Sequence, residues 1–406
     1  MDYIDRPVYM SALESYVDAP VVKVLTGIRR SGKSVLLEML KGRLQSRGVS
    51  EDRIISLNFD EFENADLRQA SALNACIVGR APAEGRYYVF LDEVQEVAEW
   101  ERVVNSLAAH GRADVYITGS NGSLLSSELA TYISGRYVTI QVAPLSFGEF
   151  VDFWRLQGRA AEGVDALFGR YLRSGGFPGL FAAEYSHEQV RSLVTDIYSS
   201  IVLRDVMGRV EVRSSELFER VAMFVLDNVG SVLSANRISV FLKSQGKTLT
   251  HQTVADYLKA LVDAFLLRRV DRYDVRGRAH LATQEKYFAG DHGIVNALLG
   301  YSAGRLPGLL ENIVQAEMRL RGYGVSVGKV GDKEIDFIAS RGDERVYLQV
   351  CVSALDPETR AREFAPLLAL RDSFPKFVLS LDALAGGTVE GVRHVYLPEF
   401  LLGSMV

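Results

Sequence analysis

Short apolar runs alternate with amphipathic segments over roughly the first 150 residues of the chain. Apolar runs without helical spacing predict buried strands at 21–25, 53–59, 87–93, 114–120 and 137–142. Apolar residues at helical spacing predict helices between these strands, for example at 35–44, 99–109 and 123–132. Strands that alternate with helices predict a parallel sheet with helices on both faces, and ligands of such sheets bind at the carboxyl ends of the strands.

A glycine-rich loop follows the first predicted strand. Residues 27–34 read Gly-Ile-Arg-Arg-Ser-Gly-Lys-Ser and match the pattern G-x-x-x-x-G-K-[ST] at every fixed position. Glycines let backbone N–H groups surround a phosphate, Lys33 brings positive charge to the β- and γ-phosphates, and the Ser34 hydroxyl suits Mg²⁺. The helix beyond adds its partial positive charge. The residues predicted to bind the nucleotide are Gly27, Ser31, Gly32, Lys33, Ser34 and Val35.

Two acidic residues, Asp92 and Glu93, end the third predicted strand. Because the carboxyl ends of parallel strands share one edge of a sheet, we expect this pair beside the phosphate loop. Asp92 would hold Mg²⁺ directly or through water, and Glu93 would polarise the attacking water. Glu93 and Lys33 are therefore the predicted catalytic residues of a nucleotide hydrolase.

Two further polar positions have two interpretations each. Ser120 follows Thr118 at the end of the fourth strand and either senses the γ-phosphate or caps the next helix. Arg136, preceded by Ser-Gly, is the candidate for an arginine that stabilises transition-state charge, in its own subunit or toward a neighbouring one. A solvated arginine at a strand entry is the alternative.

Beyond residue 150 the pattern becomes mainly helical, with helical spacing over 187–228. The run Gly175-Gly-Phe-Pro178 predicts a turn that marks a lid or hinge. Helices predicted at 232–242 and 250–262, followed by a strand at 266–270, resemble a winged helix-turn-helix. The second helix would present Thr250, Gln252, Thr253 and Lys259 to DNA, but it lacks a basic stripe, so a protein-packing module is the alternative.

The last hundred or so residues predict another α/β unit. Its elements are a helix at 310–320 and strands at 323–327, 334–338 and 346–351. A helix carboxylate, an aspartate on one strand and a [DE]-x-Lys on the next is how restriction-type nucleases assemble a Mg²⁺ site. This pattern therefore predicts a nuclease-like fold for the C-terminal residues.

The set of residues that such a nuclease site needs is incomplete in this chain. Glu311 or Glu317 and Asp336 fill the first two places, whereas the third reads Gln349-Val-Cys351. An amide replaces one metal ligand and a thiol replaces the ammonium, which removes most of the electrostatic stabilisation that hydrolysis needs. We therefore predict a degenerate site without nuclease chemistry.

Composition limits the compartment and the partners. The chain has 406 residues, of which 48% are hydrophobic and 24% charged, as in a soluble globular protein of two or three domains. The net charge of −5 leaves only a local patch for nucleic acid. Cys76 and Cys351 are far apart and lack metal-type spacing, which predicts a reducing cytoplasm. The sequence contains no stretch of about 18 apolar residues, so no membrane span is predicted.

Taken together, these residues resemble the prokaryotic AAA-type ATP-binding proteins, which pair an N-terminal P-loop ATPase with a C-terminal domain of unknown function. The resemblance spans nearly the whole chain and rests on residues 25–34, 91–95, 117–120, 134–136, 145–150, 175–178, 334–337 and 347–351. The Gly-Arg and Gly-Gly-Phe-Pro elements look like those of signal-transduction ATPases with numerous domains. The resemblance implies ATP as the nucleotide, Mg²⁺ as the metal and hydrolysis coupled to the terminal domains.

The resulting prediction is an α/β protein with four segments. They are a P-loop AAA-type ATPase domain at 1–160, a helical lid at 161–225, a winged-helix region at 226–300 and a degenerate nuclease-like domain at 301–406. The expected function is Mg²⁺-dependent ATP binding and hydrolysis that drives a conformational switch. The alternatives are a slow-turnover nucleotide-gated binding module and an ATP-dependent nuclease. Expected partners are double-stranded DNA, a protein or a second copy of the chain.

Overall fold

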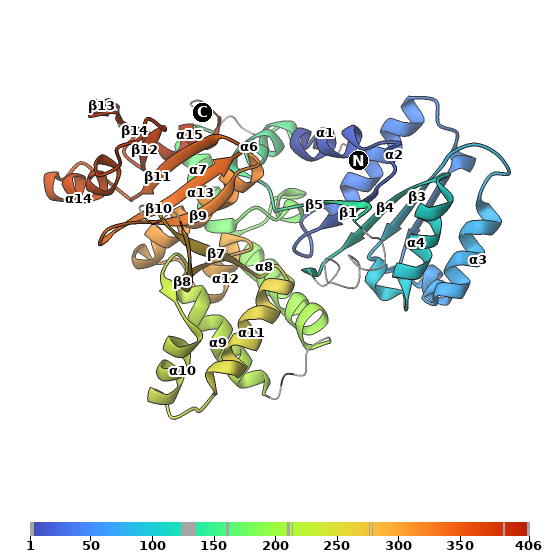
Figure 1. Cartoon of the computed structure of the whole chain (residues 1–406), viewed down its shortest axis with the longest axis horizontal. Helices are drawn as coiled ribbons and strands as arrows, with labels where there is room; N and C mark the ends of the chain where they lie inside the picture. The colour runs from blue at the N-terminus through green and yellow to red at the C-terminus, as the bar shows by residue number, and fades with distance from the viewer. Residues whose placement is uncertain are drawn as a thin grey trace. The chain divides into compact units, whose positions relative to one another are not determined.

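The chain divides into two compact units, residues 1–143 with 263–265 and residues 144–262 with 266–406 (Figure 1). The computed structural model describes residues 4–122, 135–159, 162–208, 212, 214–275, 277, 279–384 and 386–403. The predicted helix at 123–132 lies outside these residues. The finer division into lid, winged-helix and C-terminal segments stays a prediction.

The first unit is built on a five-stranded sheet in the order β2-β3-β4-β1-β5. All neighbouring strands in it are parallel. The strands are β1 (Val22–Thr26), β2 (Ile54–Asn58), β3 (Tyr87–Asp92), β4 (Ala113–Gly119) and β5 (Tyr137–Gln141). Strands β1, β3 and β4 are buried at every position, as expected for central strands covered on both faces. The predicted parallel sheet is confirmed.

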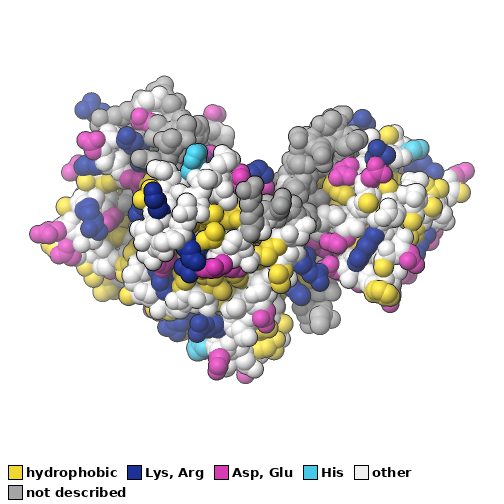
Figure 2. All heavy atoms as spheres, turned by 90° about the horizontal axis from the view of Figure 1, so that it is seen from below, with side chains coloured by type: hydrophobic (Ala, Val, Ile, Leu, Met, Phe, Trp, Pro, Cys, Tyr) yellow, Lys and Arg dark blue, Asp and Glu magenta, His cyan; other side chains and the backbone are white. Residues whose placement is uncertain are grey.

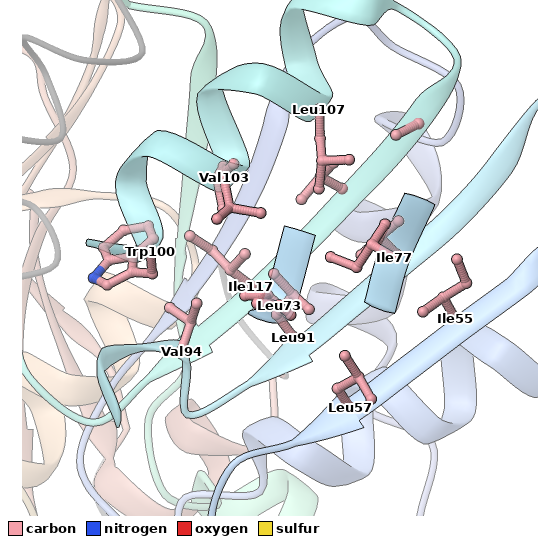
Figure 3. Close-up of a cluster of buried hydrophobic side chains, with 14 of the residues drawn as sticks. Ile55, Leu57, Leu73, Ile77, Leu91, Val94, Trp100, Val103, Leu107 and Ile117 are labelled. Carbon is pink, nitrogen blue, oxygen red and sulfur yellow. The ribbon is translucent and has the colours of Figure 1, made fainter. Parts of the chain in front are cut away.

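Helices cover both faces of this sheet (Figure 1). They are α1 (Pro7–Ser15), α2 (Lys33–Ser46), α3 (Ala70–Arg80) and α4 (Trp100–His110), with short 3₁₀ helices at Glu51–Arg53, Phe62–Leu67 and Val94–Glu96. Figure 3 shows the core between the sheet and α3 and α4, in which Leu73, Ile77, Val103 and Leu107 meet Leu91 and Ile117 of the strands. Each such side chain contributes about 1.5–3 kcal/mol when fully buried.

A buried ion pair joins β1 and β4. The Lys23 ammonium bonds the Asp114 carboxylate, and both side chains are fully buried. Tyr116 Oη and the Asp18 backbone N–H donate to the other Asp114 oxygen at 2.8 and 2.9 Å. Burial lowers the pKa of Lys23, and the bond to Asp114 opposes that shift. Lys23, which interrupts the apolar residues of the first strand, is therefore neutralised by Asp114 inside the sheet.

Replacing Asp114 by Asn should lower the free energy of unfolding of the first unit by about 3–5 kcal/mol, because Lys23 then stays buried without a counter-charge. The measurement is urea unfolding followed by Trp100 fluorescence in a Trp154→Phe background, since the chain has two tryptophans. Asp52→Asn, at an exposed aspartate of the same unit, is the control. Equal midpoints for the two variants would contradict a stabilising role of the pair.

The second unit contains a nine-stranded sheet in the order β13-β14-β12-β11-β10-β9-β7-β8-β6. Helices α6 (Phe147–Leu156), α7 (Val164–Ser174) and α8 (His187–Ile201) precede it, with a 3₁₀ turn at Pro178–Phe181 and a π-helical turn at Val202–Met207. Capping boxes start α6 at Ser146 and α8 at Ser186. The helical spacing over 187–228 thus corresponds to α8, the π-helical turn and α9.

The region predicted as a winged helix contains the two predicted helices and the strand that follows them, but Val232 and Leu233 form a strand and do not belong to the first helix. The elements of this region run in the following order. These are α9 (Ser215–Asp227), β6 (Val232–Leu233), α10 (Ala235–Ser244), α11 (His251–Asp263), β7 (Leu267–Asp274) and β8 (Ala279–Ala289). Ser214 and Ser234 cap α9 and α10 through their side-chain oxygens. Strand β8 pairs antiparallel with both β6 and β7. Strand β7 also pairs parallel with β9, so β6, β7 and β8 are part of the same sheet as the C-terminal strands.

The C-terminal segment follows α12 (His292–Leu299) and a 3₁₀ turn at Ala303–Arg305. Its elements are α13 (Leu306–Leu320), β9 (Gly324–Val330), β10 (Lys333–Arg341), β11 (Glu344–Val350), α14 (Pro357–Leu368), β12 (Lys376–Ser380), β13 (Thr388–Val389), β14 (Val392–Tyr396) and α15 (Leu397–Leu401). Strands β9, β10 and β11 are antiparallel, and α14 crosses over to the parallel strand β12. The nuclease-like detail of the fold stays a prediction. Within the described residues, no helix is long and apolar enough to span a membrane.

Candidate functional site

The phosphate loop lies between β1 and α2, as predicted. Gly27 has φ +145° and Gly32 has φ +98°, a region that side chains with a Cβ rarely adopt. A Cβ on Gly27 would also lie 2.1 Å from the Val142 carbonyl oxygen. Both glycines of the motif are therefore required by the backbone path.

Lys33 opens α2, and its ammonium is buried over the loop. Its Nζ donates to the carbonyl oxygens of Gly27 at 3.0 Å and Ile28 at 3.3 Å. The same nitrogen lies 3.9 Å from Glu93 Oε1. The structure thus brings the predicted phosphate-binding cation to the predicted catalytic carboxylate.

The acidic pair sits at the end of β3, beside the loop. Burial raises the pKa of Asp92, and hydrogen bonds from the Ser34 and Thr118 hydroxyls oppose that shift. Glu93 is buried and has φ +54°, an uncommon conformation for a residue other than glycine, asparagine or aspartate. Strained backbone of this kind is concentrated at functional sites.

Two side chains that the prediction did not select hold this pair in place. Thr118 Oγ1 donates to Asp92 and accepts the Glu93 backbone N–H at 2.9 Å. The Gln95 amide nitrogen donates to the Glu93 carboxylate. A sequence signal for Thr118 existed, because it is a polar residue two positions before Ser120 at the end of the fourth predicted strand. Ser120 is fully buried, and its role stays a prediction.

Arg136 lies at the opposite end of the sheet from the loop. The Val22 backbone N–H donates to the Arg136 carbonyl oxygen at 2.9 Å, so Arg136 stands beside the start of β1, whereas the loop follows its end. Five residues of strand span about 16 Å. The exposed Arg136 side chain is therefore not brought to the loop of its own chain. A role toward a neighbouring subunit stays a prediction.

Residues at the start of helix α1 form hydrogen bonds with the backbone of the phosphate loop and of Ala143. Arg6 donates to the carbonyl oxygens of Ser31 at 3.0 Å and Ala143 at 2.9 Å. Tyr9 Oη accepts the Ala143 backbone N–H at 3.0 Å. The Arg6 guanidinium lies 4.4 Å from the Tyr9 ring centroid. The lead-in helix is thus tied to the loop backbone by a buried arginine.

The site has hydrogen-bonding capacity left over for a ligand. Among the described residues, the buried side-chain oxygens without a hydrogen-bond partner include Thr26 Oγ1, Ser31 Oγ and Gln95 Oε1. Thr26 and Ser31 border or lie in the loop, and Gln95 contacts Glu93. Within the described part of the chain, no group of three or more His, Cys, Asp or Glu side chains could hold a metal by itself. A single carboxylate with a hydroxyl and substrate phosphates is the usual Mg²⁺ donor set.

Comparison with other proteins places the chain in a family. Residues 20–151 match the AAA domain, and residues 165–305 match a domain of unknown function. An uncharacterised protein of Haemophilus influenzae is 36% identical over 400 residues, 98% of each chain. The chain belongs to the AAA-type P-loop ATP-binding proteins with a C-terminal domain of unknown function.

More distant proteins are also similar to this chain. An uncharacterised protein of Methanocaldococcus jannaschii is 25% identical over 352 residues, 84% of this chain and 77% of that one. A Walker-type ATPase of Pyrococcus abyssi is similar with a TM-score of 0.48 and 16% identity, covering 73% of this chain and 96% of that one. The Aeropyrum pernix Orc1 protein, solved in complex with DNA, has a TM-score of 0.33 and 15% identity, covering 73% and 92%.

In this AAA-type protein the Gly-Gly-Phe-Pro turn is anchored within the second unit by Asp291. The Asp291 carboxylate accepts the backbone N–H groups of Gly176 and Gly293, each at 2.8 Å. His292 Nε2–H donates to the Tyr171 carbonyl oxygen at 2.7 Å. Burial raises the pKa of Asp291 and lowers that of His292. The turn predicted as a lid or hinge is thus tied to the start of α12.

Replacing Gly176 by Ala should lower the free energy of unfolding of the second unit by about 2–4 kcal/mol, as large overpacking changes do. The reason is that a Cβ there would lie 2.3 Å from the Leu145 backbone oxygen. Gly179→Ala is the matched control, since a Cβ at Gly179 meets nothing within 4 Å. Urea unfolding followed by Trp154 fluorescence in a Trp100→Phe background measures both. If the two variants unfold alike, the turn tolerates a Cβ and is not a packing constraint.

The C-terminal carboxylates of this AAA-type protein meet a lysine that the prediction did not select. Lys286 Nζ on β8 lies 3.0 Å from Glu311 Oε2, 2.9 Å from Glu334 Oε1 and 3.8 Å from Asp336 Oδ1. Of the two predicted helix carboxylates, Glu311 therefore joins Asp336. Glu317 instead pairs with Arg321, one turn along α13, at 2.7 Å.

Gln349 and Cys351, the two residues predicted to depart from a nuclease-like site, are uncharged. Gln349 Nε2 donates to Glu363 Oε2 at 3.0 Å, and Gln349 Oε1 accepts the Asp336 backbone N–H at 3.4 Å. Burial raises the pKa of the Cys351 thiol to about 12, and nearby carboxylates such as Glu363 add to the shift. The thiol is therefore un-ionised at neutral pH, and neither residue supplies the charge that hydrolysis would need.

Proposed function

We propose that this protein is an ATPase in which ATP hydrolysis in the first unit switches the state of the second. The observation that carries the proposal is the clustering of Lys33, Asp92, Glu93 and Thr118 beside the phosphate loop, with Glu93 held in a left-handed backbone conformation. The loop and the acidic pair all belong to the first compact unit. The C-terminal segment and the winged-helix segment, apart from residues 263–265, belong to the second.

In the proposed reaction, each polar residue of the site has a separate task. ATP with Mg²⁺ supplies the phosphoanhydride bond and the metal's positive charge. Loop N–H groups and Lys33 would bind the phosphate oxygens, and Ser34 with Asp92 would hold the metal. Glu93 orients a water molecule and takes its proton as the water oxygen bonds the γ-phosphorus. The bond to the β,γ-bridging oxygen breaks, which gives ADP and phosphate.

DNA association is the second candidate, and the order of elements in the winged-helix region favours it. The exposed side chains of α11 give it limited support. Thr250 Oγ1 accepts the Thr253 N–H at 3.1 Å and so caps α11, and Gln252 bonds Asp256 at 3.0 Å. On β7, Arg269 pairs with Asp271 at 3.3 Å and Glu285 at 3.5 Å. In Figure 2, Lys and Arg side chains form no continuous stripe on the face shown.

An ATP turnover assay with and without double-stranded DNA, at two salt concentrations, tests both candidates. Wild-type protein should hydrolyse ATP with Mg²⁺, and Lys33→Ala should not, because it removes the cation at the phosphates. Lys41→Ala on the same helix, whose ammonium pairs with Glu38 at 2.6 Å, is the control. Stimulation by DNA that fades with salt would support phosphate contacts.

The other outcomes of this assay are equally informative. Hydrolysis that persists in Lys33→Ala would contradict the proposed site. ATP binding without turnover in the wild type would support the nucleotide-gated binding module instead. Lys33-dependent turnover that DNA does not change would favour a protein partner or a second copy of the chain.

A further inference from the structure

The Lys286 ammonium lies at the centre of the C-terminal carboxylate pocket. It comes from strand β8 of the winged-helix region, whereas the surrounding carboxylates, Glu311, Glu334 and Asp336, come from α13 and β10. The Lys286 side chain is 4% exposed. Burial by itself lowers the pKa of a lysine, yet the charges of the three carboxylates outweigh it and raise the pKa of Lys286. The ammonium therefore stays charged inside the protein.

The carboxylates around Lys286 have few other cations to pair with. Arg272 reaches Glu334 at 3.4 Å, and the Val350 backbone N–H donates to Asp336 at 2.8 Å. Three carboxylates thus face the Lys286 ammonium and the Arg272 guanidinium, so acidic side chains outnumber basic ones in this pocket.

Carboxylate oxygens are the atoms that a hard divalent cation prefers as ligands. As they stand around the ammonium, these three side chains do not form a metal site in the described structure. The three oxygens nearest Lys286 Nζ lie 2.9–3.8 Å from it. Metal–oxygen distances are about 2.0–2.6 Å, so these flexible side chains would need to close by roughly 1 Å around an ion. The ammonium occupies the volume and supplies the charge that such an ion would bring.

We propose that Lys286 is a built-in cation that takes the place of a divalent metal ion in this pocket. It ties strand β8 to α13 and β10, so the winged-helix sheet and the C-terminal layer are joined by a charged centre as well as by the β7–β9 pairing. Removal of the ammonium then turns the pocket into a divalent-cation site. The inference is independent of the proposed ATPase activity.

The test is Mn²⁺ binding to the full-length, nucleotide-free chain, measured by calorimetry and by electron paramagnetic resonance. Lys286→Met keeps the length of the side chain and removes its charge. We expect this variant to bind one Mn²⁺ at least about tenfold more tightly than the wild type, because the ion no longer competes with a buried ammonium. Lys333→Met, at an exposed lysine at the start of β10, is the control and should behave as the wild type. Adding Asp336→Asn to Lys286→Met should abolish the gained binding.

Thermal unfolding gives an independent readout. Lys286→Met should unfold at a lower temperature than the wild type, and Mn²⁺ should raise that temperature for the variant only. Folded Lys286→Met that gains no Mn²⁺ binding would overturn the proposal, as would Asp336-dependent binding of equal strength in the wild type. If the methionine variant does not fold, Lys286→Gln, which can still donate hydrogen bonds, replaces it. If neither variant folds at any Mn²⁺ concentration, a divalent ion cannot replace the ammonium and the proposal fails.

Discussion

Replacing Glu93 by Gln should lower kcat for ATP hydrolysis by about 100-fold or more, because a positioned general base contributes that much or more to the rate. ATP affinity should change little, since the loop and Lys33 bind the phosphates. The substitution keeps the shape of the side chain and its contact with Gln95, which bonds the Glu93 carboxylate in the native chain. The loss would therefore report on the charge of Glu93 and its ability to take a proton.

The measurement is steady-state ATP turnover together with equilibrium binding of ATP to each variant. Glu96→Gln is the matched control, because Glu96 is an exposed acid three residues away and should leave kcat unchanged. An equal kcat in Glu93→Gln and the wild type would exclude Glu93 as the base. Loss of ATP affinity along with kcat would instead point to a binding role.

Replacing Thr118 by Val should lower kcat/KM by about 10- to 100-fold, since a hydrogen bond to a charged group is worth about 1.5–3 kcal/mol. Valine has nearly the same shape, but it cannot donate to Asp92 or accept the N–H of Glu93. Glu93 would then lose one of the bonds that hold its left-handed backbone. Thr118→Ser, which keeps the hydroxyl, should remain within a few-fold of the wild type.

The pH profile separates the two roles of Thr118. Burial already raises the pKa of Asp92, and the Thr118 hydroxyl counteracts that shift by bonding the ionised form. Without the hydroxyl the pKa of Asp92 should rise further, so less of it is ionised at a given acidic pH. The acidic limb of kcat/KM should move to higher pH in Thr118→Val, and more Mg²⁺ should be needed for half-maximal rate. An unchanged acidic limb would show that the effect does not pass through Asp92.

The phosphate loop and the acidic pair could be predicted from the sequence, because each consists of residues that are contiguous in the chain. The match at 27–34 requires a strand before it and a helix after it, and both are present as β1 and α2. Asp92 and Glu93 were placed beside the loop by one rule, that the carboxyl ends of parallel strands share an edge of the sheet. The parallel sheet, the phosphate loop, the acidic pair and the winged-helix elements all rest on such short-range patterns.

Only the tertiary structure decided which distant residues meet. Register pairs β3 with β4 so that Leu91 stands opposite Ile117, which puts Asp92 beside Thr118, and no spacing along the chain encodes that register. Pairing of β5 with β1 puts Arg136 beside the start of β1. Packing of α13 against the second sheet makes Glu311, and not Glu317, the neighbour of Asp336. Lys286 reaches the C-terminal carboxylates because β7 joins β9 in one sheet. Hydrophobic periodicity reports which face of an element is buried, whereas the partner that buries it is chosen by packing between segments far apart in the sequence.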